Sequence, residues 1–486
     1  MKNRQTLIAA TALTIEVSLF YLATLAPTVL WGDDAFFQWS AAVDYLQPDG
    51  GGHWLYFNLA RLFVHFPVGD IAYRVNLLSA AAATLTILLV FATGRSLGLS
   101  NPAAVVGALS LAVAHTFWTH AVRAEVYTVF TLMLALILWL TASWREERPI
   151  FLYTAAFLFG PTLLSHQMGL LLLPTFGLLL WLRRGWLQNK EWLFTGTAFV
   201  TGLGLGAWII QIQVGQSTLF DNLFTYLTQS GADFSGSIFA FSFSQLPADI
   251  GFWLVMLGLQ FVGPAFLLGI LGAWDMRKNA LVELPFLLFY LMTVLFAATY
   301  RVNDRYVFFL PGYLIFALMV GTGWERIEHD RPKVAYAILP LLALVPILTY
   351  ALLPPLLQTT GVSIPDARNL PGREPLSFFL WPAKGDYTEA ADFGRSALNS
   401  LPPDSILVAD HTPLQTLTYL QKVEGLRPDV LLVEVSPGDS LAPIWKRYHE
   451  NQAIYLADDN PDYYNLSSIT DGTLVPEGYV YRLNGS

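Results

Sequence analysis

The sequence Thr24-Leu-Ala-Pro-Thr-Val-Leu-Trp-Gly-Asp-Asp-Ala-Phe36 joins the end of a long apolar segment to two adjacent carboxylates. The apolar segment, residues 7–27, is long enough to cross a bilayer, which takes about 20 residues. Because no clear small-x-small cleavage site follows it, we expect this segment to be retained as a membrane span and not removed as a signal peptide. Asp33 and Asp34 are therefore expected where the first span meets water.

The composition of the whole chain also indicates a membrane protein. Of its 486 residues, 54% are hydrophobic and only 13% are charged, whereas soluble domains carry about 25% charged residues. So few charges cannot cover a soluble surface, and the high hydrophobicity excludes an intrinsically disordered chain. The net charge of −9 excludes nucleic acid as an expected partner. Because the chain has 0 Cys, it forms no disulfides and has no thiolate nucleophile.

Eleven apolar stretches are predicted to span the membrane. They are residues 7–27, 71–93, 102–117, 124–143, 150–163, 165–182, 192–213, 250–273, 281–299, 306–322 and 334–354. If the N-terminus is cytoplasmic, thirteen Lys and Arg lie at the cytoplasmic ends of these spans and five at the opposite ends, as the positive-inside rule requires. The odd number of spans then places the C-terminal region outside. We therefore expect an all-α polytopic domain over residues 1–354, located as a multi-pass protein in the cell membrane.

The rest of the chain is predicted to lie on the outer face. Long outer loops are expected at residues 28–70 and 214–249, and the Pro-rich residues 355–384 are expected to form a linker. Residues 385–486 are less apolar and alternate short strand-like runs with helical spacing, which is typical of a small α/β domain. The strand-like runs are residues 405–409, 430–435 and 453–457, and the helical stretches are 386–399 and 413–423.

Asp33 and Asp34 are the leading candidates for catalysis. Desolvation at the membrane surface raises the pKa of a carboxylate toward the range in which it works as a general base. The two side chains need not share a face, so one could face the protein interior and the other water. The same Gly-Asp-Asp triplet is also typical of the cap of a following helix, here residues 35–45. These residues alone leave both interpretations open.

Other ionisable residues gather at predicted outer ends of the spans. Arg123 and Glu125 lie at the outer start of the span at 124–143, where they belong to a functional site or anchor the helix at the interface. His166 lies between two apolar runs, where packing and function are both open. Arg74 opens the second span and is either a phosphate partner or an interfacial anchor.

Residues 299–306, TYRVNDRY, place two arginines around Asp304. Arg301 and Arg305 suit a phosphate group because a guanidinium donates two parallel hydrogen bonds. A lipid headgroup at the membrane surface would use the same contacts. The sequence has no Walker A motif and no spacing typical of a metal site. A divalent cation remains possible in principle, because Asp304 would chelate one if it converged with the Asp33–Asp34 pair.

Several blocks of the chain resemble a known family. They are Thr24–Asp33, Tyr73–Ser79, Phe117–Trp118 with Ala124–Tyr127, Asp304 with Tyr306 and Pro311, Pro402–Leu407 and Arg427–Val430. These blocks are similar to the large prokaryotic family of multi-pass membrane proteins that is allied to protein O-mannosyltransferases, within the GT-C glycosyltransferase superfamily. The resemblance touches nearly the whole chain, including its soluble end.

The resemblance implies a GT-C fold and an inverting transfer of a hexosyl or pentosyl sugar on the outer face. The donor would be a polyprenyl-phosphate sugar from the membrane, and the acceptor a hydroxyl on a protein, lipid or glycan. Asp33 occupies the position of the family's first-loop aspartate, which acts as general base, and Asp34 would support it. The predicted substrate-binding residues are Arg301, Arg305, Arg123, Arg74, Glu125, His166, Asp304 and His53, with basic groups stabilising the developing phosphate charge.

The chain departs from the family pattern in this first loop. Phe36 stands where the family commonly has glutamate, and Asp49-Gly-Gly-Gly52 followed by His53 replaces a His-Pro-Pro-Gly stretch. Two other functions are therefore kept as alternatives. One is a polytopic transporter or lipid-carrier flippase, which would need ionisable residues near the bilayer midplane. The other is a non-catalytic scaffold with a GT-C-like fold.

Overall fold

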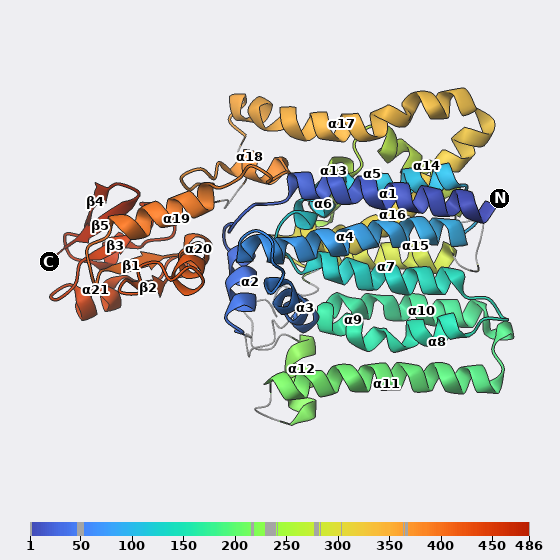
Figure 1. The fold of residues 1–486 in the computed structure, drawn as a ribbon, viewed down its shortest axis with the longest axis horizontal. Coiled ribbons are helices and arrows are strands. Elements are labelled where there is room, and N and C mark those ends of the chain that lie inside the picture. The colour runs from blue at the N-terminus through green and yellow to red at the C-terminus, as the bar shows by residue number, and fades with distance from the viewer. Residues whose placement is uncertain are drawn as a thin grey trace.

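Long apolar helices run side by side through most of the chain, and a small sheet-containing domain caps one end of the bundle (Figure 1). The computed structural model describes residues 2–485 apart from 46–52, 215–217, 229–239, 241, 277–280, 282, 303, 363 and 365–367. The stretch Asp49–Gly52 and much of the predicted second outer loop therefore lie outside the described residues. The N-terminus lies at the end of the bundle opposite to the sheet-containing domain (Figure 1).

The bundle contains the apolar helices that the sequence predicts. They are α1 Lys2–Thr24, α4 Ile71–Ser96, α5 Asn101–Ala112, α6 His115–Ala121, α7 Tyr127–Ser143, α8 Ile150–Phe157, α9 Phe159–Ser165, α10 Leu172–Leu182, α11 Asn189–Val214, α13 Leu246–Gln260, α14 Pro264–Met276, α15 Glu283–Thr299, α16 Leu310–Asp330 and α17 Pro332–Thr359. Among the described residues, 5 helices are long and apolar enough to cross a membrane, or up to 7 spans if each of two bent pairs counts as one. Shorter apolar helices complete the set, and each predicted span coincides with one of these helices or pairs.

Two predicted spans are bent. The helices α5 and α6 meet at 71°, and α13 and α14 meet at 115°, so the span predicted over 250–273 is a pair of helices with a sharp bend between them. The second bend follows from its sequence. Gly263 has φ +69°, a left-handed conformation that glycine tolerates, and Pro264 cannot continue the hydrogen-bond ladder of the preceding helix.

Glycines allow the central helices to approach closely. A methyl group added at Gly272 of α14 would lie 1.8 Å from the carbonyl oxygen of Met319 in α16. One added at Gly323 of α16 would lie 2.0 Å from the carbonyl oxygen of Leu268 in α14. Such backbone contact is how helices associate where lipid removes the hydrophobic driving force. Helix α16 is the centre of the bundle. Of the residues in its most apolar stretch, 94% are buried, whereas only 17% are buried in the corresponding stretches of α1 and α17.

The first predicted outer loop contains two short helices, α2 Asp33–Ala42 and α3 Trp54–Val64. Both lie at the end of the bundle that carries the small domain (Figure 1). The second predicted loop contains α12 Leu219–Thr228. In the predicted linker, α17 continues to Thr359 and a further helix, α18, spans Pro375–Leu380. The segments between spans are therefore more helical than the sequence suggests.

The C-terminal domain has the predicted α/β character. It contains α19 Glu389–Ser400, β1 Ile406–Ala409, α20 His411–Lys422, β2 Leu431–Glu434, α21 Ala442–Tyr448, β3 Ile454–Leu456, β4 Thr473–Glu477 and β5 Val480–Asn484. The strand order is β2-β1-β3-β5-β4, with β1 parallel to β2 and β3, and β5 antiparallel to its neighbours. The three predicted strands and two predicted helices are present, while α21, β4 and β5 were not foreseen.

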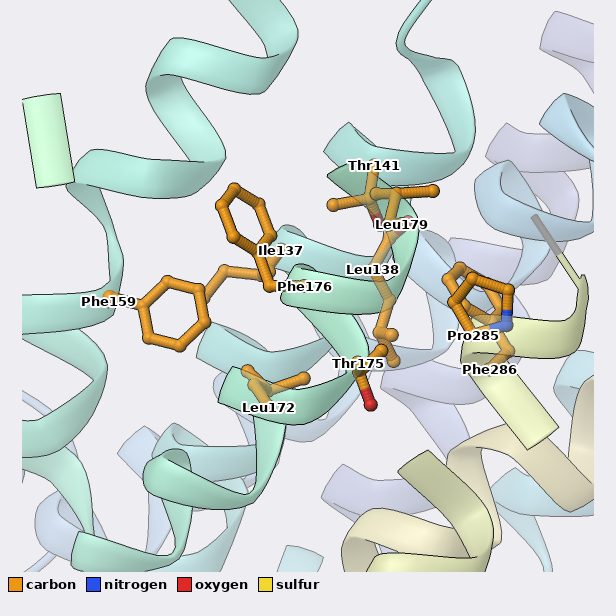
Figure 2. Close-up of a pocket in the computed structure, with 10 residues that line it drawn as sticks. All are labelled: Ile137, Leu138, Thr141, Phe159, Leu172, Thr175, Phe176, Leu179, Pro285 and Phe286. Atoms are coloured by element: carbon orange, nitrogen blue, oxygen red, sulfur yellow. The ribbon is translucent and has the colours of Figure 1, made fainter. Parts of the chain in front are cut away.

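The bundle core contains a small cavity (Figure 2). The cavity measures about 10 Å³, which is room for a single water molecule at most. Its lining is mainly apolar and comes from Ile137, Leu138, Thr141, Phe159, Leu172, Thr175, Phe176, Leu179, Pro285 and Phe286. This cavity is too small for a substrate, and the ionisable side chains meet instead at the end of the bundle that carries the small domain.

Candidate active site

The first turn of α2 places the two adjacent carboxylates in different environments. Successive helical residues point about 100° apart. The Asp33 side chain is 66% exposed, whereas the Asp34 side chain is only 4% exposed. The residue before the helix is Gly32, with φ +56° and no side chain that could cap the helix. In the described chain, both carboxylates contact side chains from other segments, so helix capping alone does not explain them.

Asp33 is bound by the C-terminal domain. Nε2 of His411, at the start of α20, lies 2.9 Å from Oδ1 of Asp33, and Nδ1 of the same ring lies 3.2 Å from Oε1 of Glu434. Burial alone would lower the pKa of His411, but its hydrogen bonds and charge interactions with the two carboxylates raise it to about 10. Burial favours protonated Asp33, yet His411 and the nearby charge of Arg123 outweigh it and lower the Asp33 pKa. Asp33 is therefore ionised at neutral pH.

The contact between Asp33 and His411 is part of a larger interface between α2 and α20. The amide of Gly32 donates to the carbonyl of Thr412 at 2.9 Å, and Nε1 of Trp39 donates to Oε1 of Gln415 at 2.8 Å. The Thr416 hydroxyl donates to the carbonyl of Leu30 at 2.7 Å. Because these bonds are spread along both segments, the C-terminal domain fixes the position of the helix that carries Asp33.

Asp34 belongs to a buried ion cluster around Arg123. Nε of Arg123 lies 3.4 Å from Oδ1 of Asp34, and Nη2 lies 3.1 Å from Oε1 of Glu125. The predicted contact between Arg123 and Glu125 is therefore present, but inside the protein. Burial raises the pKa of Asp34 to about 7, with Arg123 opposing and the charge of Asp33 adding to the rise. Burial also raises the Glu125 pKa, so one cation faces two carboxyl groups that resist joint ionisation.

His53, His166 and Asp304 lie around the same carboxylates. Nδ1 of His53 is 2.9 Å from the carbonyl oxygen of Ser165, and the rings of His53 and His166 have centroids 5.2 Å apart. The charge of Asp33 acts on His53 and on Asp304. Desolvation and the charge of Asp33 raise the pKa of Asp304 to about 6. The sequence blocks that contain these residues are far apart in the chain but meet here.

Arg301 and Arg305 form a separate cluster around Asp249 of α13. Nη2 of Arg301 lies 2.7 Å from Oδ2 of Asp249, and Nη1 of Arg305 lies 2.9 Å from Oδ1. The Arg305 guanidinium also stacks on the Phe252 ring at 4.0 Å. The sequence suggested that these arginines frame Asp304, but both point to Asp249 instead. Their side chains are 27% and 18% exposed, so water reaches this cluster.

Arg74 binds backbone carbonyls of the segment just before α4. Its guanidinium donates to Val64, Val68 and Gly69 at 2.8 to 3.1 Å. These bonds hold the turn between α3 and α4. These contacts stabilise the turn, and both interfacial anchoring by Arg74 and its role as a phosphate partner stay predictions.

Phe36, which stands where the resemblance predicts a glutamate, makes aromatic contacts instead. Its ring packs edge-on against Trp39 at 5.4 Å and Phe57 at 6.2 Å between centroids. A carboxylate there would have to displace this packing. Asp34, two residues earlier, is the buried carboxylate of the same helix.

Four residues near the carboxylates were not foreseen from the sequence. They are His411, Glu434, Arg373 and Lys384. A signal existed for His411, because it follows β1, and side chains beyond the carboxyl ends of parallel strands often form sites. Lys384 is only 1% exposed. Burial lowers its pKa to about 7, with Arg123 adding to the fall and Asp34 opposing it.

The carboxylates bear on the predicted divalent cation. Asp33 and Asp304 interact through their charges, and a hard cation between them would relieve that repulsion. Among the residues that the structure describes, no three His, Asp or Glu side chains are close enough together to hold a metal ion. The divalent cation stays a prediction, and no step below depends on it.

Comparison with known proteins relates this chain to sugar-transferring membrane proteins. Residues 41–190 match the family model described as the Protein O-mannosyl-transferase TMEM260 N-terminal domain. The mouse (Mus musculus) protein of that name is 24% identical over 473 residues, which cover 87% of this chain and 62% of the mouse protein. The chain thus spans less than two thirds of the length of this relative.

Solved structures show the same fold at low sequence identity. ArnT from Cupriavidus metallidurans bound to undecaprenyl phosphate has a TM-score of 0.57 and 14% identity, covering 98% of this chain and 97% of ArnT. The Archaeoglobus fulgidus oligosaccharyltransferase has a TM-score of 0.53 and 12% identity, covering 93% of this chain and 67% of that protein. The predicted resemblance is confirmed. This chain has the GT-C fold of these solved structures, with many apolar helices, and is similar in sequence to the protein O-mannosyl-transferase TMEM260.

Proposed function

We propose that this chain is a membrane glycosyltransferase that moves a sugar from a polyprenyl-phosphate carrier to an acceptor hydroxyl, with inversion at the anomeric carbon. The observation that carries the proposal is an ionised, solvent-accessible carboxylate, Asp33, held at 2.9 Å by His411 at one end of a GT-C bundle. A site for this reaction needs a base for the acceptor and cations for the leaving phosphate. Both kinds of group lie at this end of the bundle.

Asp33 is the proposed general base. It takes the proton of the acceptor hydroxyl as that oxygen attacks the anomeric carbon, and the bond between this carbon and the phosphate oxygen breaks. The electron pair of that bond leaves with the lipid phosphate. The expected rise of the pKa is not met at Asp33; its lowered pKa keeps the carboxylate ionised at neutral pH but makes it a weaker base. Asp34, whose pKa is about 7, supports the site from the buried side through Arg123.

Arg301 and Arg305 are the proposed contacts for the carrier phosphate. They share one carboxylate, Asp249, so their cluster keeps an excess positive charge. Asp304, whose pKa responds to Asp33, precedes Arg305 directly in the chain. The short segment that carries the arginines therefore approaches the proposed base. Arg123 is a second cation on the side of Asp34, and its two carboxylate partners make it the weaker candidate.

The nature of donor and acceptor rests on relatives. ArnT of Cupriavidus metallidurans was solved with undecaprenyl phosphate, which supports a polyprenyl-phosphate carrier for this chain. The mouse relative is named a protein O-mannosyl-transferase, which supports mannose as the sugar and a protein hydroxyl as the acceptor. Lipid and glycan acceptors remain the other candidates. The Lys and Arg distribution supports a cytoplasmic N-terminus, which places the site and the C-terminal domain outside.

The test is a transfer assay with the purified full chain in lipid nanodiscs. The donor is undecaprenyl-phosphate mannose with a radioactive sugar, and the acceptor is a threonine-containing peptide. We expect Asp33→Asn to slow transfer by about 10²- to 10⁴-fold, the usual contribution of a general base. Asp44→Asn is the matched control, because Asp44 lies just after the same helix, is 80% exposed and pairs only with Arg61 in the described chain.

The alternatives give different results in this assay. The aromatic packing of Phe36 is compatible with a non-catalytic scaffold. If the chain is a scaffold, neither the original chain nor the control variant would transfer sugar. A flippase would also transfer no sugar in nanodiscs, and a separate assay in vesicles would show it moving the lipid carrier across the membrane without consuming it. Equal transfer by Asp33→Asn and Asp44→Asn would contradict the assignment of Asp33 as the base.

A further inference from the structure

A groove on the C-terminal domain lies beside the proposed base. It has a volume of about 500 Å³ and runs between α20 and β2, within the size range of ligand sites. One wall is a face of α20 at helical spacing, formed by Leu414, Thr418 and Gln421. The opposite wall includes Leu432 and Glu434 of β2.

One end of this groove reaches the active site. Glu434 lines the groove, and its carboxylate is 3.2 Å from the ring of His411, which itself is 2.9 Å from Asp33. Only one imidazole ring therefore separates the groove from the base. Next to the groove, the ammonium of Lys422 lies 4.0 Å from the Trp39 ring of α2, so the bundle also borders it.

Strand β2 offers unused hydrogen-bonding groups along the groove. It is the first strand of the sheet order and pairs with β1 alone in the described sheet. The amide of Leu431 donates to the carbonyl of the residue just before β1 at 2.9 Å, and the amide of Val435 donates to the carbonyl of the last residue of β1 at 3.1 Å. Because bonding direction alternates along a strand, the amides and carbonyls of Leu432 and Glu434 face the opposite way. Such an edge can accept an added strand.

We propose that an extended segment of an acceptor polypeptide binds in this groove along β2 and presents a Ser or Thr hydroxyl to Asp33. The proposal rests on the glycosyl transfer proposed above and assigns the place where its polypeptide acceptor binds. The four residues of β2 would pair with about four residues of the segment. Leu414 and Leu432 offer apolar contacts, and Thr418 offers a hydroxyl contact.

The charges around the groove favour a polypeptide over an anionic lipid or glycan. Glu434 is 51% exposed at the end next to the base, and Asp429 also lines the groove. Lys422 is the lining cation, and it lies over the Trp39 ring. A polyanion would meet carboxylates on its way to Asp33, whereas a neutral or basic segment would not.

The test measures binding of a peptide to the full chain in nanodiscs by fluorescence anisotropy. The probe is a fluorescein-labelled, eight-residue peptide of Ala, Val and Thr, compared with the same peptide methylated at alternate backbone amides. Methylation removes the donors that would pair with β2 and leaves the side chains in place. We expect the methylated peptide to bind at least about tenfold more weakly, as the loss of two hydrogen bonds implies.

Two variants locate the binding. Thr418→Arg fills the groove and should weaken binding of the unmethylated peptide by at least about tenfold. Thr473→Arg is the matched control, because Thr473 is exposed on β4 at the opposite edge of the sheet, and it should bind like the original chain. Thermal unfolding of both variants checks their folding, and the methylated peptide tests the original chain without any substitution.

The outcomes separate this inference from the proposed function. The proposal that the groove binds the acceptor would be overturned by any of three results. These are equal binding of both peptides, unchanged peptide binding by Thr418→Arg, and no saturable binding. Saturable, methylation-sensitive binding without any sugar transfer would support the groove and count against the glycosyltransferase. Transfer that Thr418→Arg leaves intact would support the enzyme and reject the groove.

Discussion

Two ion clusters at the same end of the bundle have opposite compositions. In one, Arg123 lies between Asp34 and Glu125, at 3.4 and 3.1 Å. In the other, Asp249 lies between the two arginines of residues 301–305, at 2.7 and 2.9 Å. The first cluster has an excess of carboxylates and the second an excess of cations.

This difference separates the two tasks of the proposed reaction. Burial raises the pKa values of Asp34 and Glu125, and the charges of neighbouring carboxylates add to the rise, which makes this side a place for protons. Arginines in excess keep a net positive charge that suits a phosphate. The proposed role of each cluster therefore follows from whether carboxylates or cations are in excess within it. The number of charged residues in one stretch of sequence does not decide that role.

The largest expected effect comes from removing the cation of the carboxylate-rich cluster. Arg123→Met would leave two buried carboxyl groups without their partner, which should cost about 3–5 kcal/mol of stability. The loss should grow as pH rises above about 7, because Asp34 must then ionise unpaired. Thermal unfolding in nanodiscs at several pH values measures it.

A surface pair provides the control for this prediction. Arg61 binds Asp44 at 2.7 Å, but Asp44 is 80% exposed. Arg61→Met should therefore cost less than about 1 kcal/mol. If both variants unfolded at the same temperature, the buried cluster would have no special role in stability.

The next effect concerns the cation-rich cluster. Arg305→Gln would leave Asp249 with one arginine and neutralise the cluster, so the KM for the polyprenyl-phosphate donor should rise about 10- to 100-fold. This corresponds to the loss of one charged hydrogen bond of about 1.5–3 kcal/mol. Steady-state kinetics with varied donor concentration measures the change, and kcat should change less than KM.

Arg326→Gln is the matched control for Arg305→Gln. Arg326 also pairs with an aspartate, Asp275, at 3.2 Å, but it lies in the last turns of α16, away from Asp33. An equal rise in KM for both variants would mean that the effect of Arg305 is not local to a phosphate site.

The smallest effect is the pH dependence of the contact between the C-terminal domain and Asp33. His411 has a pKa of about 10 in the folded chain and about 6.5 when unfolded. Its stabilising contribution is therefore complete below about pH 6.5 and is lost as pH rises toward 10. The difference in Tm between the original chain and His411→Asn should be largest near pH 6 and vanish near pH 10.

Asp33 and Glu434 are the charged groups that face His411. Glu434→Gln should shrink the same difference in Tm without abolishing it, because the bond to Asp33 remains. A difference in Tm that stays constant from pH 6 to pH 10 would show that the imidazole charge does not support the interface.

Much of the fold can be predicted from the sequence. Bilayer thickness sets the length of each apolar stretch, and alternation of short strands and helices reveals the C-terminal domain. The bend at Gly263 was missed, although Pro264 is a signal that a helix stops before it. Strands β4 and β5 were missed because their residues are partly exposed and only weakly alternating.

The candidate site was only partly predictable. Asp33 and Asp34 stand out because carboxylates next to an apolar span are costly. His411 is 378 residues from Asp33, and no local pattern could reveal that contact. For the same reason the sequence paired the arginines of 301–305 with neighbouring Asp304, whereas packing of α13 brings Asp249 to them.

A structure of the full chain with undecaprenyl-phosphate mannose, solved on the Asp33→Asn variant in nanodiscs, tests the account most directly. We expect the phosphate within hydrogen-bonding distance of Arg301 or Arg305 and the anomeric carbon of mannose facing residue 33 beside His411. A carrier phosphate bound elsewhere on the bundle, with the sugar remote from residue 33, would contradict the division of labour between the two ion clusters.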